Sequence, residues 1–162
     1  MTNEPHCRAD SEKIVRKYAD TVYRLAFSQM RNSYDAEDVF QEVFLRYFRK
    51  KPQFKNDEHE KAWFLRVTIN CAKKYWASAW VRRTEPVSEE LPFENMREFE
   101  LFDAVGTLPQ KYRVVIHLYY FEGYSTAEIA AITGQREPTV RSQLARARAK
   151  LRDTIGGEKN AE

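Results

Sequence analysis

Residues 125–152 read STAEIAAITGQREPTVRSQLARARAKLR, which predicts two helices separated by a tight turn. Ser125 and Glu128 have the spacing of a capping box, in which two side chains satisfy the free amides at a helix start. Gly134 can adopt the left-handed conformation that ends a helix. Pro138 suits the first turn of the next helix, because its missing N–H costs nothing there.

The two helices, over about residues 126–133 and 138–155, have the lengths and turn of a helix-turn-helix, a motif whose second helix enters the major groove of DNA. They are expected to pack through Ile129, Ile132, Val140, Leu144, Ala147 and Leu151. The candidate DNA-binding residues lie on the other face: Thr139, Arg141, Ser142, Ala145, Arg146, Arg148 and Lys150. Residues 139–146 would lie against base edges, where arginine can bond guanine bidentately. Arg148, Lys150 and Arg152 would contact phosphates. The alternative is a basic amphipathic helix that only packs on its own domain.

Three more helices are expected in the first half of the chain, and the second of them shows the strongest helical period. It should follow an N-cap at Asp35 and end near Pro52. Its apolar residues recur every three or four positions: Ala36, Val39, Phe40, Val43, Phe44, Tyr47 and Phe48. The opposite face is polar and carries Asp38, Gln41, Glu42 and Arg46. A helix over residues 11–30 should precede it.

A third helix, over residues 61–80, is both aromatic and basic. One face can pack as core through Ala62, Leu65, Ile69, Ala72 and Trp76. The other should present Asn70, Lys73, Lys74 and Tyr75. For Trp63, Trp76 and Trp80, core packing is favoured over base stacking. Three helices of this size predict one compact bundle.

Charge is distributed in blocks that suggest two nucleic-acid surfaces and a connector. Residues 61–83 contain six basic residues and no acid, and residues 134–153 contain six basic residues against two acids. Between them, residues 84–103 contain seven acids and one basic residue. The predicted organisation is all-α: a bundle over residues 1–83, an acidic linker over 84–100 with a weak helix possible between 95 and 102, and a four-helix module over 101–162.

Other functional classes are not supported. No run approaches the eighteen apolar residues of a membrane span, and residues 1–10 lack an apolar signal core, so a cytoplasmic protein is expected. Cys7 and Cys71 stand far apart, and the three histidines are not spaced as metal ligands. With no nucleophile–base pair or phosphate-binding loop, we expect neither an enzyme nor a bound cofactor or metal.

Three segments resemble the sigma-70 family of RNA polymerase sigma factors. Residues 124–134 and 139–152 resemble its region 4, residues 35–46 (DAEDVFQEVFLR) its region 2.2, and residues 62–75 (AWFLRVTINCAKKY) its regions 2.3 and 2.4. The short length and the absence of a domain between them resemble the extracytoplasmic function (ECF) group. The resemblance covers about residues 11–83 and 101–155.

This resemblance implies specific partners. The matching polar residues of region 2.2, Asp38, Gln41, Glu42 and Arg46, would dock on the clamp helices of the polymerase β′ subunit, and the second module would meet the β flap. Asn70 would lie near a flipped −10 base, with Lys73, Lys74 and Tyr75 along the strand. The helix-turn-helix would read the −35 element, and an anti-sigma factor would hold the protein inactive.

Two alternatives remain open from the residues themselves. One is a helix-turn-helix repressor or activator that acts without polymerase, with residues 1–83 as a dimerisation or sensor bundle. The other is a phage-type structural or packaging adaptor that binds DNA mostly by charge. Within the motif, Gln135 and the Glu137–Pro138 pair depart from the common family pattern, which bears on the −35 preference.

Overall fold

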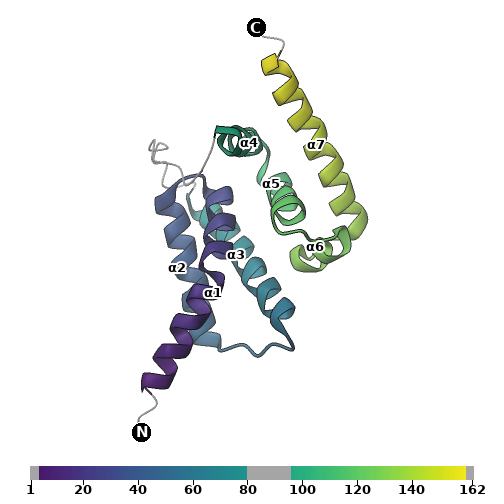
Figure 1. Cartoon of the computed structure of the whole chain (residues 1–162). Coiled ribbons are helices and arrows are strands. Elements are labelled where there is room, and N and C mark those ends of the chain that lie inside the picture. Colours follow the sequence, from purple (N-terminus) through teal and green to yellow (C-terminus); the bar gives the residue numbers. More distant parts are fainter. Residues whose placement is uncertain (1–3, 80–95, 160–162) are drawn as a thin grey trace. The chain divides into compact units, whose positions relative to one another are not determined.

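The computed structural model describes residues 4–79 and 96–159, and side chains over residues 8–78 and 100–156. Every regular element in these ranges is a helix, which confirms the all-α prediction (Figure 1). The chain divides into two compact units, Met1–Thr84 and Glu85–Glu162. No helix of the described ranges is both long and apolar enough to cross a membrane.

The first unit is a bundle of three helices, α1 (Glu4–Met30), α2 (Ser33–Lys50) and α3 (Asp57–Ala79). Each of the three helices packs against the other two. Their apolar stripes form a core that includes Val22, Leu25, Val39, Val43, Phe64, Leu65 and Ile69. The predicted bundle is therefore confirmed.

The helix starts differ from the prediction. The N-cap of α2 is Asn32 rather than Asp35: its Oδ1 accepts the Asp35 N–H at 2.8 Å, and its Nδ2 donates to Asp35 Oδ2 at 2.7 Å. Asp35 therefore lies inside the first turn, where its charge still suits the helix dipole. Helix α1 begins seven residues, and α3 four residues, earlier than expected, because polar and acidic residues can continue a helix without contributing apolar period.

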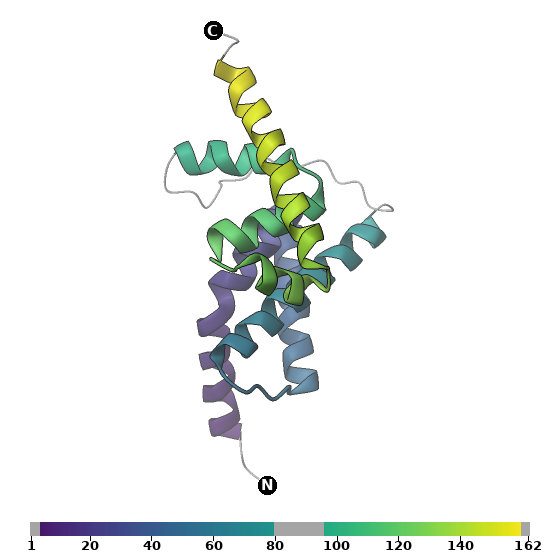
Figure 2. The same cartoon turned by 90° about the vertical axis from the view of Figure 1, so that its right-hand side faces the viewer.

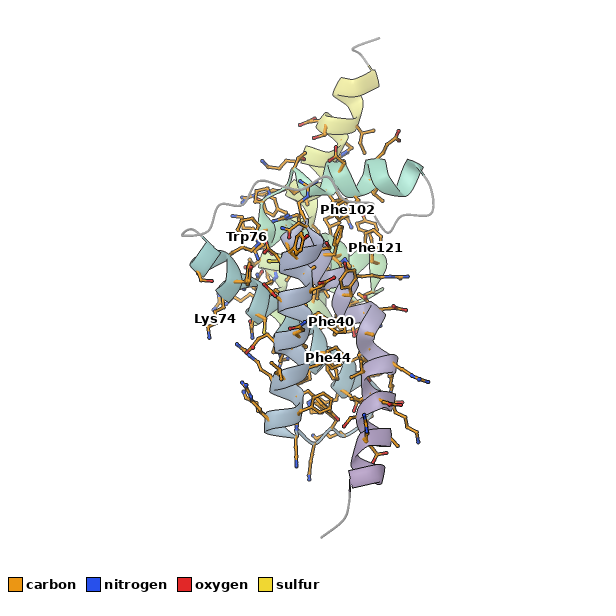
Figure 3. All side chains as sticks on the ribbon, turned by 90° about the vertical axis from the view of Figure 1, so that its left-hand side faces the viewer. Phe40, Phe44, Lys74, Trp76, Phe102 and Phe121 are labelled. Atoms are coloured by element: carbon orange, nitrogen blue, oxygen red, sulfur yellow. The ribbon has the colours of Figure 1, made fainter. Side chains whose placement is uncertain are left out.

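Aromatic side chains from all three helices meet at Phe64, which is fully buried. Its ring stacks on Tyr18 of α1 at 4.5 Å and on Tyr47 of α2 at 5.2 Å, and lies 5.4 Å from Phe44. Figure 3 shows Phe44 inside the bundle. The Tyr18 hydroxyl donates to Glu60 Oε1 at 2.7 Å, and burial together with this bond raises the pKa of Tyr18 to about 12. The cluster ties α1, α2 and α3 together.

The second unit holds α4 (Met96–Gly106), α5 (Gln110–Ile116), a π-helical turn η1 (His117–Phe121), α6 (Thr126–Thr133) and α7 (Glu137–Lys159). Helix α7 packs against α4, α5 and α6, and Figure 2 shows α4 lying across it. Because α4 begins at Met96, the last residues of the expected linker are helical, as the weak-helix prediction allowed. The rest of the linker lies outside the described residues, as does Trp80.

We predict that Phe64→Ala lowers the free energy of unfolding of the first unit by about 3–5 kcal/mol, because it empties the centre of the aromatic cluster. Trp63, Trp76 and Trp80 all lie in residues 1–84, so tryptophan fluorescence during urea denaturation reports this unit alone. Leu45→Ala, at a half-exposed position on α2, is the control and should cost at most about 0.5 kcal/mol. Equal losses in both variants would contradict the packing described.

Candidate nucleic-acid interfaces and docking surface

The polar face of α2 is presented to solvent as predicted, with Asp38 and Gln41 exposed. Glu42 and Arg46 are less accessible, since Arg46 Nε donates to Glu42 Oε1 at 3.1 Å one turn away. Leu45 lies close to these residues in sequence and is 46% exposed. Sequence reasoning missed Leu45, although it is an aliphatic residue of this helix outside the buried period. The surface therefore combines exposed acid and amide groups with an exposed apolar side chain.

On α3, Asn70, Lys73 and Lys74 are exposed, as expected for a nucleic-acid surface. Lys74 projects from the helix in Figure 3. Lys74 also borders a shallow groove between α2 and α3, whose other walls include Glu42 and Arg46. The basic face of α3 and the polar face of α2 thus adjoin within one unit.

Tyr75 does not share the solvent-facing position expected for it. It is only partly exposed, and its hydroxyl donates to Asp35 Oδ1 at 2.6 Å and to Asp38 Oδ2 at 3.3 Å. The bond to Asp35 raises the pKa of Tyr75 well above its usual range. Tyr75 therefore links α3 to the acidic start of α2.

One tryptophan of α3 also differs from the core prediction. Trp63 packs as expected, with its ring 5.1 Å from Phe64 and 5.8 Å from Tyr47. Trp76 was expected in the core but is 45% exposed, and its Nε1 donates to the Gln29 carbonyl at 3.0 Å. That bond satisfies the indole N–H at the edge of the bundle while one part of the ring faces solvent.

The helix-turn-helix has the predicted geometry. Ser125 is the N-cap of α6, its Oγ accepting the Glu128 N–H at 3.2 Å, and Gly134 ends that helix with a φ of 71°. Gly134 suits this turn because residues with a side chain rarely adopt such a φ. The packing residues Ile129, Ile132, Val140, Leu144 and Ala147 are buried, and α6 packs against α7, which confirms the predicted interface for these residues. Leu151, expected in the same interface, is half-buried and lines a groove with residues of α4 and η1 instead.

The outward face of α7 carries most of the predicted DNA-binding residues. The exposed ones are Thr139, Arg141, Ser142, Ala145, Arg146 and Lys150. Arg148 is different: its Nε donates to the Tyr120 hydroxyl at 2.6 Å, and its guanidinium lies over the rings of Tyr119 and Tyr120 at 5.3 and 5.6 Å. Arg148 therefore faces η1 rather than lying free beside the other basic residues.

Glu137 holds the two helices of the motif together through one oxygen. Its Oε1 accepts from the Thr126 hydroxyl at 2.9 Å and from Arg141 Nη2 at 2.7 Å. The bond from Thr126, followed by that from Arg141, holds the pKa of Glu137 below its usual value. Sequence reasoning treated Glu137 only as a departure from the family pattern. The spacing of four to Arg141 was the signal available.

An apolar groove crosses the second unit, and the sequence did not reveal it. Its walls come from α4, η1 and α7, with Leu101, Val105, Tyr120, Phe121 and Leu151 among them and Arg148 and Arg152 at the edge. The π-helical turn leaves Phe121 60% exposed, while the buried His117 ring stacks on it at 5.3 Å. Such a groove suits an apolar helix or loop of another protein. Across residues 8–78 and 100–156, no three His, Cys, Asp or Glu side chains gather as a metal site.

Comparison with known proteins places both units in one family. The family model described as Sigma-70 region 2 matches residues 14–82, and the model described as Sigma-70, region 4, matches residues 98–151. The fold is shared with the sigma factor RpoE of Bartonella quintana, solved in complex with the anti-sigma factor NepR: the TM-score is 0.74 at 21% identity, over 91% of this chain and 97% of that one. CnrH, solved with the cytosolic domain of CnrY, gives a TM-score of 0.68 at 24% identity, over 93% of this chain and 90% of that one.

Relatives identified by sequence similarity are also RNA polymerase sigma factors, and the similarity extends over most of the chain. ECF RNA polymerase sigma factor SigE of Mycolicibacterium smegmatis is 33% identical over 89% of this chain, which spans 61% of that protein's length. RNA polymerase sigma factor SigV of Bacillus subtilis is 30% identical over 82% of this chain and 83% of its own length. ECF RNA polymerase sigma factor SigW of Bacillus subtilis is 30% identical over 88% of this chain and 87% of its own length. The chain therefore belongs to the ECF group of the sigma-70 family of RNA polymerase sigma factors.

Proposed function

We propose that this sigma factor divides promoter recognition between its two units. Residues 1–83 dock on core RNA polymerase and melt and read the −10 element, residues 84–100 connect, and residues 101–162 read the −35 element. The observation that carries this proposal is the adjacency, within one bundle, of an exposed acid–amide face on α2 and an exposed amide–lysine face on α3. A stand-alone repressor or a packaging adaptor does not need two such adjacent surfaces. Neither of these alternatives explains the match of residues 14–82 to the region 2 model.

Polymerase docking is assigned to Asp38 and Gln41, with Glu42 and Arg46 beside them. An exposed acidic and amide surface on a rigid helix suits a basic helical partner such as the β′ clamp helices. Leu45 supplies the apolar contact that such interfaces commonly centre on. The ion pair between Glu42 and Arg46 keeps both side chains ordered before the partner arrives.

Reading of the −10 element is assigned to Asn70, Lys73 and Lys74. Opening four or five base-pair steps costs roughly 6–7 kcal/mol at a mean of about 1.4 kcal/mol per step. An amide that holds one flipped base, together with lysines that follow the phosphates, offsets part of that cost, and the polymerase supplies the rest. Tyr75, whose hydroxyl is bound to Asp35 and Asp38, serves to join this surface to the docking helix.

Reading of the −35 element is assigned to the outward face of α7. Arg141, Ser142 and Arg146 lie near the start of the helix, where base edges are within reach in helix-turn-helix complexes. Lys150 contacts phosphate further along. Arg148 takes part only through the surface that it shares with Tyr119 and Tyr120.

Two further protein partners are assigned: the β flap to the second unit, and an anti-sigma factor to the chain as a whole. The apolar groove with Phe121 at its wall receives the β flap, whose contact would bury that ring. The Bartonella quintana sigma factor of the same fold was solved with an anti-sigma factor, and a protein of that class would hold this chain inactive. The chain acts in the cytoplasm, where polymerase is found, and has no catalytic activity of its own.

We predict that the double variant Asp38→Asn, Gln41→Ala weakens binding to core polymerase roughly tenfold, the loss expected when hydrogen bonds involving a charged group disappear. The measurement is a titration of labelled protein with core enzyme, followed by fluorescence anisotropy. Glu37→Gln, which removes an exposed charge from the same turn of α2, is the matched control and should bind as wild type. The docking assignment fails if the double variant binds as tightly as the control.

We also predict that Asn70→Ala slows open-complex formation on duplex promoters while core binding stays within about twofold of wild type. The amide is exposed, so its loss removes a contact to the unpaired base without disturbing the bundle. Permanganate reactivity of unpaired thymines measures the opening. Gln53→Ala removes an exposed amide outside the helices and serves as control. Unchanged opening in Asn70→Ala would remove this residue from the site.

A further inference from the structure

Glu137 lies beside the face of α7 that is proposed to contact DNA, where a negatively charged side chain is unexpected. DNA phosphates repel a negative charge, so an acid near this surface lowers affinity for every sequence. A glutamate is ionised at neutral pH, and the two hydrogen bonds to Oε1 lower the pKa of Glu137 further, so the cost is present whenever the motif approaches DNA. A benefit other than affinity must therefore account for it.

The ion pair with Arg141 adds little to the stability of the fold. The Arg141 side chain is 67% exposed and that of Glu137 is 37% exposed. Solvent-exposed ion pairs four residues apart on a helix contribute little to stability, because water screens them and ordering two long side chains costs entropy. The arrangement is also more specific than a simple ion pair, since Thr126 of α6 holds the same carboxylate oxygen that Arg141 contacts.

The effect of the arrangement is to fix the direction of Arg141. A free arginine on a helix surface samples many rotamers and loses them when it binds a base. Here one terminal nitrogen, Nη2, is bound at 2.7 Å to an acceptor that is itself anchored to the preceding helix. The planar guanidinium carries five N–H donors in a rigid fork, so donors remain for the two acceptors of a guanine edge. Ordering the fork before binding favours the one base edge that matches it.

We propose that Glu137 is a specificity-determining positioning residue of the −35 reader, holding Arg141 in the orientation that reads a base while Thr126 holds Glu137. The inference rests on the proposed function of α7 as the −35 reading helix. Three consequences follow. Glu137 acts through Arg141, it increases discrimination between −35 sequences, and it lowers rather than raises affinity for DNA in general.

The test uses full-length protein assembled with core polymerase, and measures transcription from a preferred promoter and from the same promoter with single substitutions across the −35 element. The ratio of the two is the discrimination. We expect Glu137→Ala to lower it roughly tenfold, the value of one bidentate base contact. Transcription from the substituted promoters should rise, because a charge that repels phosphates is gone. Glu137→Gln, which keeps an acceptor, and Thr126→Val should give smaller losses in the same direction.

Coupling to Arg141 separates this role from a structural one. Arg141→Ala should lower discrimination by itself, and adding Glu137→Ala to it should lower discrimination no further, since residues that act as a unit are not additive. Asp153→Ala removes an exposed acid from the same helix and controls for charge. Lys150→Ala should weaken transcription from all promoters evenly. Thermal unfolding followed by circular dichroism checks that the variants remain folded.

Three results would overturn the inference: wild-type discrimination in Glu137→Ala, a full further loss on top of Arg141→Ala, or an equal change in Asp153→Ala. These outcomes are distinct from failure of the proposed function. If wild-type protein fails to bind core polymerase, or transcribes without regard to the −35 element, the assignment of α7 falls and this inference falls with it. If wild-type protein depends on the −35 element and Glu137→Ala does not alter that dependence, only the role of Glu137 is wrong.

Discussion

The packing of three helices onto Phe64 is the constraint on which the first unit depends. A helix with one apolar stripe can bury that stripe in only one rotation about its axis, so burial also decides where the polar face points. Tyr18, Phe44 and Tyr47 contact Phe64 from α1 and α2, which fixes both rotations relative to α3. Asp38 and Gln41 then face solvent from α2, and Asn70 faces solvent from α3. The surfaces proposed for docking and melting are thus consequences of the core.

The same logic builds the DNA reader in the second unit. Val140, Leu144 and Ala147 are buried along one side of α7, so the residues between them face outward as a rigid surface. Packing of the helix decides which way its surface faces, but it does not fix the conformation of each exposed side chain. Three neighbours do this for the basic residues: Glu137 for Arg141, and Tyr119 with Tyr120 for Arg148.

Features set by local chemistry could be predicted from the sequence. The bounds of α6, its serine cap and its glycine end follow from residues within ten positions of one another, and the structure has all three where expected. The buried periods of α2 and α7 were predictable for the same reason. The cap of α2 was assigned to the wrong residue, since Asn32 and Asp35 are both good capping residues, and it is the Asn32 side chain that accepts the backbone N–H of Asp35.

Contacts between distant residues could not be predicted in this way. Tyr75 bonds to a residue 40 positions away, and Arg148 bonds to one 28 positions away, so nothing in their own neighbourhoods indicated which way they point. Trp76 lies at the edge of the bundle because the Gln29 carbonyl satisfies its indole there. The apolar groove depends on a π-helical turn, which has no simple sequence signature. The residues named for each surface from sequence were mostly exposed, and their binding roles remain predictions.

The central claim is that one bundle couples polymerase docking to promoter opening. It is tested most directly by adding the purified protein to core polymerase and sequencing the run-off transcripts from a randomised promoter library. We expect transcripts that start downstream of a shared pair of elements, one near −10 and one near −35, and none with core enzyme alone. Tight binding of the free protein to duplex DNA, with no association with core and no promoter-dependent transcript, would contradict the account.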